Sequence, residues 1–284
     1  MITLARRNLK LFFRDRTAVF FSLLAVLVLL GLYVFFLGDV MLADFSSVEG
    51  IKVVLGSWLM AGILAVTAVT TPLGALGSMV EDEAWHITKD FRAAPIRRRS
   101  LAGGYILSAM LVGAILCLVV LAVAEIYLPL VGGSLLPPGI LLRMLGLILA
   151  SVLCGSSLVF LLMSFFHSTK GYSAASTVVG TLIGFVTGIY IPIGTLPEAM
   201  QWVIRCFPMT HAATLLRQTL MQAPLEQMAR VLPPETVQAL RLELGVDLSF
   251  GGGVLPAWVS VAILAGTTLV CYGLGVAVLS RKQR

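Results

Sequence analysis

Residues 81–101 read EDEAWHITKDFRAAPIRRRSL, and this polar stretch lies between two long apolar runs. It begins with three acidic residues, continues as a short amphipathic segment, and ends with Pro95 and three consecutive arginines. Of the 284 residues of the chain, 58% are hydrophobic and only 12% are charged, and the mean hydropathy is +0.99. Soluble domains carry about 25% charged residues. The composition therefore argues against a soluble globule and predicts a membrane protein.

The apolar runs on both sides of this stretch predict an all-α membrane protein that forms a single transmembrane domain over residues 1–284. One membrane-spanning helix needs about 20 apolar residues, which leaves room for six spans. We expect these spans at about residues 17–37, 52–80, 103–130, 140–166, 174–193 and 256–279.

Residues 194–253 contain no apolar run long enough for a further span. The sequence GTLPEAMQWVIRCFP at 194–208 is apolar for only about ten residues, too few to cross the bilayer. It favours an outer re-entrant helical hairpin, and the sequence after it favours short amphipathic helices.

The N-terminal residues 1–16 predict an amphipathic helix on the membrane surface, because basic and apolar side chains fall on different arcs. We expect its basic residues to anchor it at anionic headgroups: Arg6, Arg7, Lys10 and Arg14. The alternative, a signal-peptide n-region, is disfavoured because no small-residue cleavage site follows the first apolar run.

The positions of the 20 lysines and arginines predict the orientation of the chain. Most of them fall in segments on the side of the N-terminus, and the positive-inside rule places that side in the cytoplasm. We therefore expect a multi-pass membrane protein with both termini and residues 81–101 in the cytoplasm. Arg97, Arg98 and Arg99 would hold the chain at the headgroups. Because the bases adjoin apolar spans, the net charge of +6 does not indicate a nucleic-acid partner.

The polar stretch itself predicts a helix of two turns from Ala84 to Arg92, which Pro95 prevents from continuing. Trp85, Ile87 and Phe91 would be exposed apolar side chains on this helix. Exposed aromatic groups favour a docking surface for a cytoplasmic partner, although a solvated loop is the simpler alternative.

Three stretches of the chain resemble the permease subunit of type-2 ABC exporters, and together the likeness covers nearly the whole length. They are LARRNLKLFFRDR at the N-terminus, MVEDEAWHITKDFRAAPIRRRSLAGGYIL between the second and third spans, and IYIPIGTLPEAMQWVIRCFPMTHAATLLRQTL after the fifth. In that family, an acidic end of the second span leads into a coupling helix, a proline and basic residues. The chain departs from the family pattern at AWHITKD, where a small-residue pair is usual, and in its longer outer segment, residues 222–253.

The resemblance implies that two permease chains associate and that two cytoplasmic ABC ATPase subunits dock on their coupling helices. A homodimer in a bacterial plasma membrane is expected, with a heterodimer as the alternative, and membrane lipid is the other partner. The chain lacks a G-x-x-x-x-G-K-[ST] loop, so ATP and Mg would be bound by the ATPase and no cofactor is expected in this chain, which is not itself an enzyme. The resemblance places Glu81, Glu83, Phe91, Pro95 and Arg98 at the positions of the family pattern. Together with the exposed side chains of the docking surface, the expected ATPase-coupling residues are Glu81, Glu83, Trp85, Ile87, Phe91 and Pro95.

For the substrate, the apolar spans and short loops favour an amphipathic drug, antibiotic or lipid-like molecule, as in multidrug export. A lipid-linked polysaccharide is the alternative. A secondary transporter would need more intramembrane charge and an internal repeat. An integral membrane enzyme would need convergent acidic, His or Cys residues at membrane depth. A serine protease built from Ser156 or Ser157 with His211 is disfavoured, because a further span separates them.

Glu125 is the one acidic residue predicted within a span, near the outer end of the third. Arg143 lies at a similar depth in the fourth span, so the two could form an ion pair across the turn VGGSLLPPG. The alternatives for Glu125 are a role in the substrate path or gate and snorkelling to the outer interface. His86 and His167 are isolated and the four cysteines predict small buried side chains, so no metal site is expected.

Overall fold

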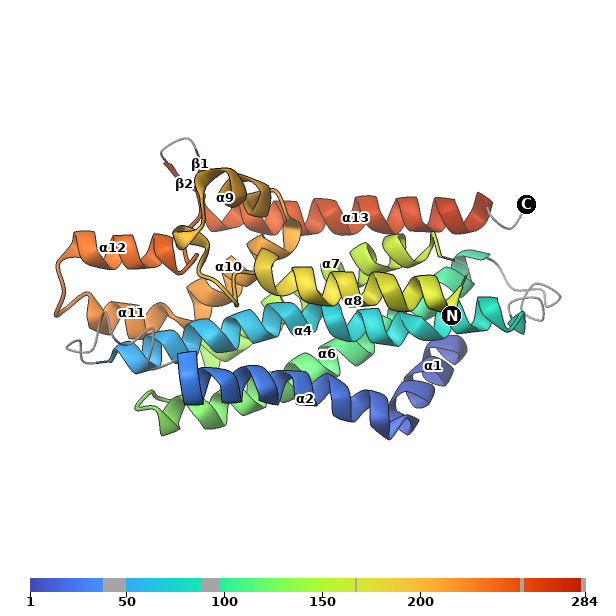
Figure 1. The fold of residues 1–284 in the computed structure, drawn as a ribbon, viewed down its shortest axis with the longest axis horizontal. Helices are drawn as coiled ribbons and strands as arrows, with labels where there is room; N and C mark the ends of the chain where they lie inside the picture. Colours follow the sequence, from blue (N-terminus) through green and yellow to red (C-terminus); the bar gives the residue numbers. More distant parts are fainter. Residues whose placement is uncertain (38–49, 88–97, 167, 251–252, 282–284) are drawn as a thin grey trace.

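The computed structural model describes residues 1–37, 50–87, 98–166, 168–250 and 253–281, and these form an elongated bundle of helices (Figure 1). The elements in chain order are α1 (Ile2–Arg14), α2 (Arg16–Leu32), the π-helical turn η1 (Tyr33–Leu37), α4 (Ile51–Ala84), α6 (Arg98–Leu130), α7 (Pro138–Met163), α8 (Thr169–Val186), the 3-10 turn η2 (Ile193–Thr195), α9 (Glu198–Arg205), α10 (Pro208–Leu220), α11 (Gln222–Met228), α12 (Pro234–Glu243), β1 (Ser249–Phe250), β2 (Gly253–Val254) and α13 (Ala257–Arg281). The all-α prediction is confirmed, apart from a two-residue antiparallel hairpin of β1 and β2.

Five helices within the described ranges are long and apolar enough to cross a membrane: α2, α4, α6, α7 and α13. The predicted fifth span, residues 174–193, corresponds to α8, which is not among them. Helix α8 has only 18 residues and includes Lys170 and several hydroxyl side chains. It ends at Val186, and Gly188 adopts a left-handed conformation (φ +66°) just beyond it. Several membrane-spanning helices are therefore present, but the count of six is not confirmed.

Helix α4 forms the centre of the bundle. In its most apolar stretch 89% of the residues are buried, compared with 12% for α2 and 17% for α13. It packs against α6, α7, α8 and α10 and more lightly against α2. Glycine permits the closest of these approaches, since a Cβ on Gly155 of α7 would meet the carbonyl oxygen of Ala68 in α4. Small residues have the same role in membrane helix packing generally, because they let two backbones come close.

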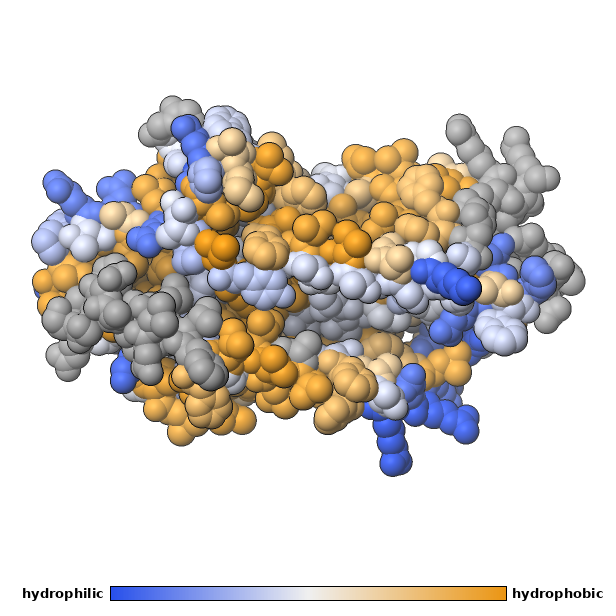
Figure 2. Space-filling view, viewed as in Figure 1, coloured by the Kyte–Doolittle hydropathy of each residue, from blue (hydrophilic) through white to orange (hydrophobic). Residues whose placement is uncertain are grey.

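The outermost helices present apolar side chains to their surroundings. Phe20, Phe21 and Leu27 of α2 are exposed, and so are Trp258 and Leu269 of α13. Figure 2 shows the hydrophobic surface over both helices, on either side of a paler band. Large exposed apolar areas of this kind suit contact with lipid.

Helix α10 enters the bundle although it is too short to span a membrane. It packs against α4, α7 and α13, and nearly all of its residues are buried. Its Arg217 has no exposed surface and donates from Nη2 to the carbonyl oxygens of Thr187 (2.8 Å) and Gly188 (3.0 Å), at the C-terminal end of α8. The indole ring of Trp58 in α4 lies 5.3 Å from the guanidinium carbon. Arg217 thus joins α4, α8 and α10.

The packing of α7 on α4 yields a stability prediction. Gly155→Ala should lower the free energy of unfolding by about 1–3 kcal/mol, because the new methyl group collides with the backbone of α4. Gly146→Ala in the same helix is the matched control, since nothing lies within 4 Å of its Cβ position. Thermal denaturation of the detergent-solubilised protein, followed by size exclusion, measures both changes. Equal melting temperatures for the two variants would contradict the close approach.

Candidate functional site

Three helices meet at one end of the bundle, where the C-terminal turn of α4 lies beside α1 and the first turns of α6 (Figure 1). The guanidinium of Arg7 in α1 binds the carboxylate of Asp82 in α4 through two hydrogen bonds, from Nη1 to Oδ2 (2.7 Å) and from Nη2 to Oδ1 (2.9 Å). Asp82 is only 3% exposed. A bidentate arginine–carboxylate pair is among the strongest polar contacts in proteins and fixes the relative orientation of the two groups.

The third helix joins the same carboxylate. The hydroxyl of Tyr105 in α6 donates to Oδ2 of Asp82 at 2.6 Å, and Tyr105 is itself buried. Beside it, the amide of Asn8 in α1 lies 3.5 Å from the hydroxyl of Ser108 in α6, which donates to the carbonyl oxygen of Tyr105 at 2.7 Å. We name Arg7, Asp82 and Tyr105 the Arg7–Asp82–Tyr105 cluster. One buried carboxylate thus connects α1, α4 and α6.

Local sequence brings these side chains together. Gly104 lets α1 lie directly on α6, because a Cβ at this position would be 2.8 Å from Cδ2 of Leu4. Arg7 and Asn8 then face the bundle. The hydrogen bond from Arg7 to Asp82 stabilises the charged guanidinium and raises the pKa of Arg7 above its ordinary value.

One of the predicted headgroup anchors has a different contact. Arg7 was expected to face anionic headgroups with Arg6, Lys10 and Arg14, but it is bound to Asp82. Helical periodicity alone placed Arg7 on the basic arc, and it could not show that a buried carboxylate lies beneath that arc. Arg6, Lys10 and Arg14 are exposed, and their anchoring role stays a prediction.

The predicted coupling residues follow directly after Asp82. Glu81 is exposed, Glu83 is partly buried, and Trp85 and Ile87 are 76% and 36% exposed. Helix α4 ends at Ala84, and His86 just beyond it adopts a left-handed conformation (φ 62°). Of the helix predicted from Ala84 to Arg92, residues 88–92 lie outside the described residues, so this helix stays a prediction.

Other predicted residues of this stretch fall outside the description. Phe91, Pro95 and Arg97 lie outside the described residues, and so do the side chains of Arg98 and Arg99. Asp82 is not among the site residues predicted from the sequence, and it is the residue that sequence reasoning missed. A carboxylate at the buried end of a span, with an arginine on a preceding surface helix, is the signal that could have found it.

The predicted ion pair between Glu125 and Arg143 is not formed within the described part of the chain. Oε2 of Glu125 instead accepts a hydrogen bond from the backbone N–H of Leu136 at 3.3 Å, and its Oε1 is buried with no hydrogen-bond partner there. Arg143 is exposed. The turn after α6 folds back on the helix and supplies a nearer donor than α7.

His211 and Ser260 form a buried pair that joins α10 to α13. Nδ1 of His211 lies 3.0 Å from the hydroxyl of Ser260, and Nε2 lies 2.9 Å from the carbonyl oxygen of Arg205. A carbonyl oxygen can only accept, so Nε2 carries the proton. Both side chains are at most 2% exposed, so the pair connects helices and is not open to a substrate.

Comparison with known families identifies the class of the protein. The family described as ABC-2 family transporter protein matches residues 40–277, well over half of the chain, so the chain belongs to this family. It is the membrane-spanning permease subunit of an ABC transporter, and family membership implies association with an ATPase subunit. Comparison with curated proteins finds no match.

The Arg7–Asp82–Tyr105 cluster yields a second stability prediction. Arg7→Gln should cost about 1–3 kcal/mol of unfolding free energy, because Asp82 then remains a buried charge without its cationic partner. Adding Asp82→Asn should recover part of this loss, since it removes the uncompensated charge. Arg6→Gln, which changes the neighbouring exposed arginine, should have no effect. Melting temperatures of the four purified proteins test this, and equal effects of Arg6→Gln and Arg7→Gln would contradict the ion pair.

Proposed function

We propose that the chain is the permease of an ATP-driven exporter that acts as a dimer and moves an amphipathic drug, antibiotic or lipid-like molecule out of the cytoplasm. The observation that carries this proposal is that Trp85 and Asp82 lie close together in the sequence, at the C-terminal end of α4. The exposed aromatic ring and the buried carboxylate are three residues apart at the end of α4, so a partner that binds the first acts directly on the second.

The positions of the helix ends support a cytoplasmic location for the segment that begins at Trp85. Helix α1, the C-terminal end of α4, the start of α6 and the C-terminal end of α13 lie at one end of the bundle (Figure 1). The basic residues exposed on α1 belong to this end, and the positive-inside rule assigns it to the cytoplasm. ATPase subunits would therefore meet the segment that begins at Trp85.

In the proposed mechanism, α4 transmits the displacement caused by the ATPase subunits from one end of the bundle to the other. Closure of the ATPase subunits on ATP would displace the segment after Ala84, and the Arg7–Asp82–Tyr105 cluster would carry this displacement to α1 and α6. Helix α2 would follow α1, because Asp15 between them caps α2 by accepting from the N–H groups of Thr17 and Ala18. At the far end, the indole N–H of Trp58 donates to the carbonyl oxygen of Leu244 at 2.9 Å, so α4 would also move the outer segment.

A weakly polar band supports both the dimer and the amphipathic substrate. It lies along α8 and α4 between the hydrophobic surfaces of α13 and α2 (Figure 2). On α8, the exposed side chains of Ser173, Thr177 and Thr181 each donate from the hydroxyl to the carbonyl oxygen four residues before. Small hydroxyl groups satisfied in this way suit contact with a second permease copy or an amphipathic molecule better than contact with an ion.

The coupling proposal predicts that Trp85→Asp weakens binding of the ATPase subunit about tenfold or more, because a large apolar side chain leaves the interface and a charge enters it. Trp85→Phe should retain most of the binding. Co-purification of the tagged permease with its ATPase measures both. A complex that survives Trp85→Asp with full export would show that the docking surface lies elsewhere.

The energy source provides a separate test. Vesicles that contain the permease and its ATPase should transport only with hydrolysable ATP, and Arg7→Gln should reduce transport more than it reduces ATPase binding, since the cluster acts after docking. Transport by vesicles that contain the permease alone and are driven by an ion gradient would contradict the proposal and favour a secondary transporter.

A further inference from the structure

The buried guanidinium of Arg217 is only partly hydrogen-bonded. Its Nη2 donates to the carbonyl oxygens of Thr187 and Gly188, but Nε and Nη1 are buried without a hydrogen-bond partner among the described residues. The ring of Trp58 compensates part of the charge. Burial lowers the pKa of Arg217 to about 9, so the group is still charged at neutral pH. Water would stabilise such a group, because a buried charge with unpaired N–H groups is costly.

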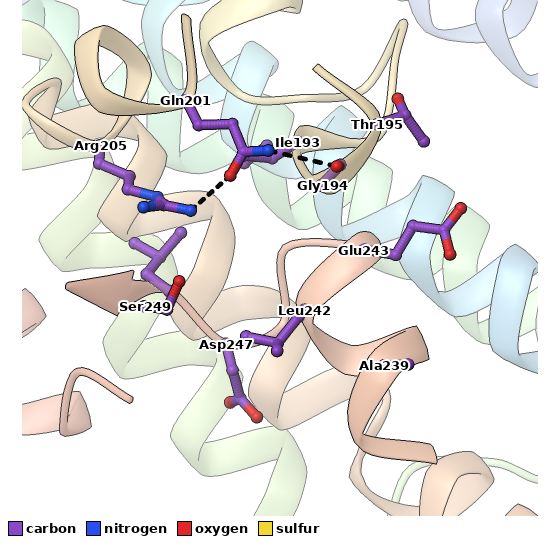
Figure 3. A pocket seen from close by; sticks show the side chains of 11 residues that line it. Ile193, Gly194, Thr195, Gln201, Arg205, Ala239, Leu242, Glu243, Asp247 and Ser249 are labelled. Carbon is purple, nitrogen blue, oxygen red and sulfur yellow. Dashed lines mark hydrogen bonds between the residues drawn. The ribbon is translucent and has the colours of Figure 1, made fainter. Parts of the chain in front are cut away.

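An open cavity of about 540 Å³ lies between α9, η2 and α12 (Figure 3), at the end of the bundle opposite α1. Thr195 and Ala239 line the cavity and are exposed, so it is open to its surroundings. The charged residues Arg205 and Asp247 also line it. Polar walls of this kind suit a cavity that holds water.

Ile193 is the residue through which the cavity adjoins Arg217. It lines the cavity (Figure 3), yet it is only 2% exposed. A Cβ on Gly245 would lie 2.9 Å from Cδ1 of Ile193 and 3.1 Å from Nη1 of Arg217. The tip of the isoleucine and one of the unpaired nitrogen atoms therefore lie beside the same glycine.

Ile193 also packs on a residue that Arg217 binds. A Cβ on Gly188 would lie 2.5 Å from Cγ1 of Ile193, and the carbonyl oxygen of Gly188 accepts from Arg217. Gly188 and Gly245 both adopt left-handed conformations (φ +66° and +65°), which glycine reaches without strain. The side chain of Ile193 thus contacts two glycines, one on each side of the guanidinium's contacts with the chain.

We propose that Ile193 and Arg217 form a hydration-controlled contact between α8 and α10. While Ile193 is in place, it keeps water in the cavity away from the guanidinium, and Nη2 holds the end of α8 against α10. When Ile193 moves, water hydrates the unpaired nitrogen atoms and competes for Nη2, so the end of α8 is released.

The two states of this contact have opposing stabilisation. Burial of an apolar side chain favours the closed state, and hydration of a charge favours the open one. The inference does not rest on the proposed function, because the contact is a property of the permease alone and can be tested without the ATPase.

Thiol labelling of the purified permease in detergent tests the proposal. Thr187→Cys, in a variant whose four native cysteines are replaced by alanine, is the reporter, because Thr187 has no exposed surface and its carbonyl oxygen is bound by Arg217. A charged, water-soluble methanethiosulfonate reagent modifies this cysteine only when water reaches the end of α8. Ile193→Ala should increase the labelling rate about tenfold or more, and Ile193→Leu, which retains the apolar volume, less than about twofold.

Ile191→Ala is the matched control, since Ile191 is exposed and does not line the cavity, and it should leave the labelling rate unchanged. A double-mutant cycle tests Arg217. In an Arg217→Met background Ile193→Ala should raise the rate at most about twofold, because no charge remains for water to hydrate. Ser173→Cys, at an exposed position of α8, gives the upper limit of the rate. Arg217→Gln replaces Arg217→Met if the latter does not fold.

Three results would overturn the inference. Equal rates for Ile193→Ala and Ile191→Ala would show that Ile193 does not keep water from the end of α8. Equal increases on Ile193→Ala with and without Arg217 would show that the guanidinium is not the group that water hydrates. Labelling of the Arg217→Met variant at the rate of Ser173→Cys would show that α8 is released without any hydrated charge.

Discussion

Close packing of helices around α4 is the constraint on which the rest of this structure depends. Lipid surrounds a membrane protein, so the hydrophobic effect does little to hold its helices together, and contact between backbones and small residues must do so. Gly155 allows α7 to reach the backbone of α4. A Cβ at Gly113 of α6 would lie 2.9 Å from Val152 and 3.0 Å from Pro72. Helix α4 is enclosed in this way by neighbours that pack directly on it.

Polar contacts tie the two ends of α4 to different neighbours. At one end, Asp82 accepts from Arg7 and Tyr105 and joins the helices next to the proposed ATPase site. At the other, Arg217 and Trp58 join α4 to α8 and α10. A buried guanidinium without a carboxylate would ordinarily be costly. Here it lies against the C-terminal carbonyls of α8, where the helix dipole is negative, and against the face of an indole ring.

The outer segment shows how short helices can serve a membrane protein. Helix α10 cannot cross the bilayer, yet its position among α4, α7 and α13 lets it tie the spans together. Helix α9 presents apolar residues outward, while Gln201 and Arg205 line the cavity beneath it. The carbonyl oxygen of Arg205 is fixed by His211, which is fixed by Ser260 of α13. The cavity is therefore built on the bundle and not on a free loop.

The sequence by itself determined the class of fold and the family, because long apolar runs can be stable in a membrane only as helices, which satisfy their own backbone hydrogen bonds. It also located the region next to the proposed ATPase site, since the exposure of Trp85 follows from a polar segment between two spans. Tertiary structure alone decided the partners of the charged residues. Arg7 and Asp82 are 75 residues apart, and whether an arginine meets a lipid headgroup or a buried carboxylate depends on how α1 lies on α4 and α6. Tertiary structure also decided the partner of Glu125. It accepts a hydrogen bond from Leu136 and does not pair with Arg143, because a polar group is satisfied by the nearest donor that the fold supplies.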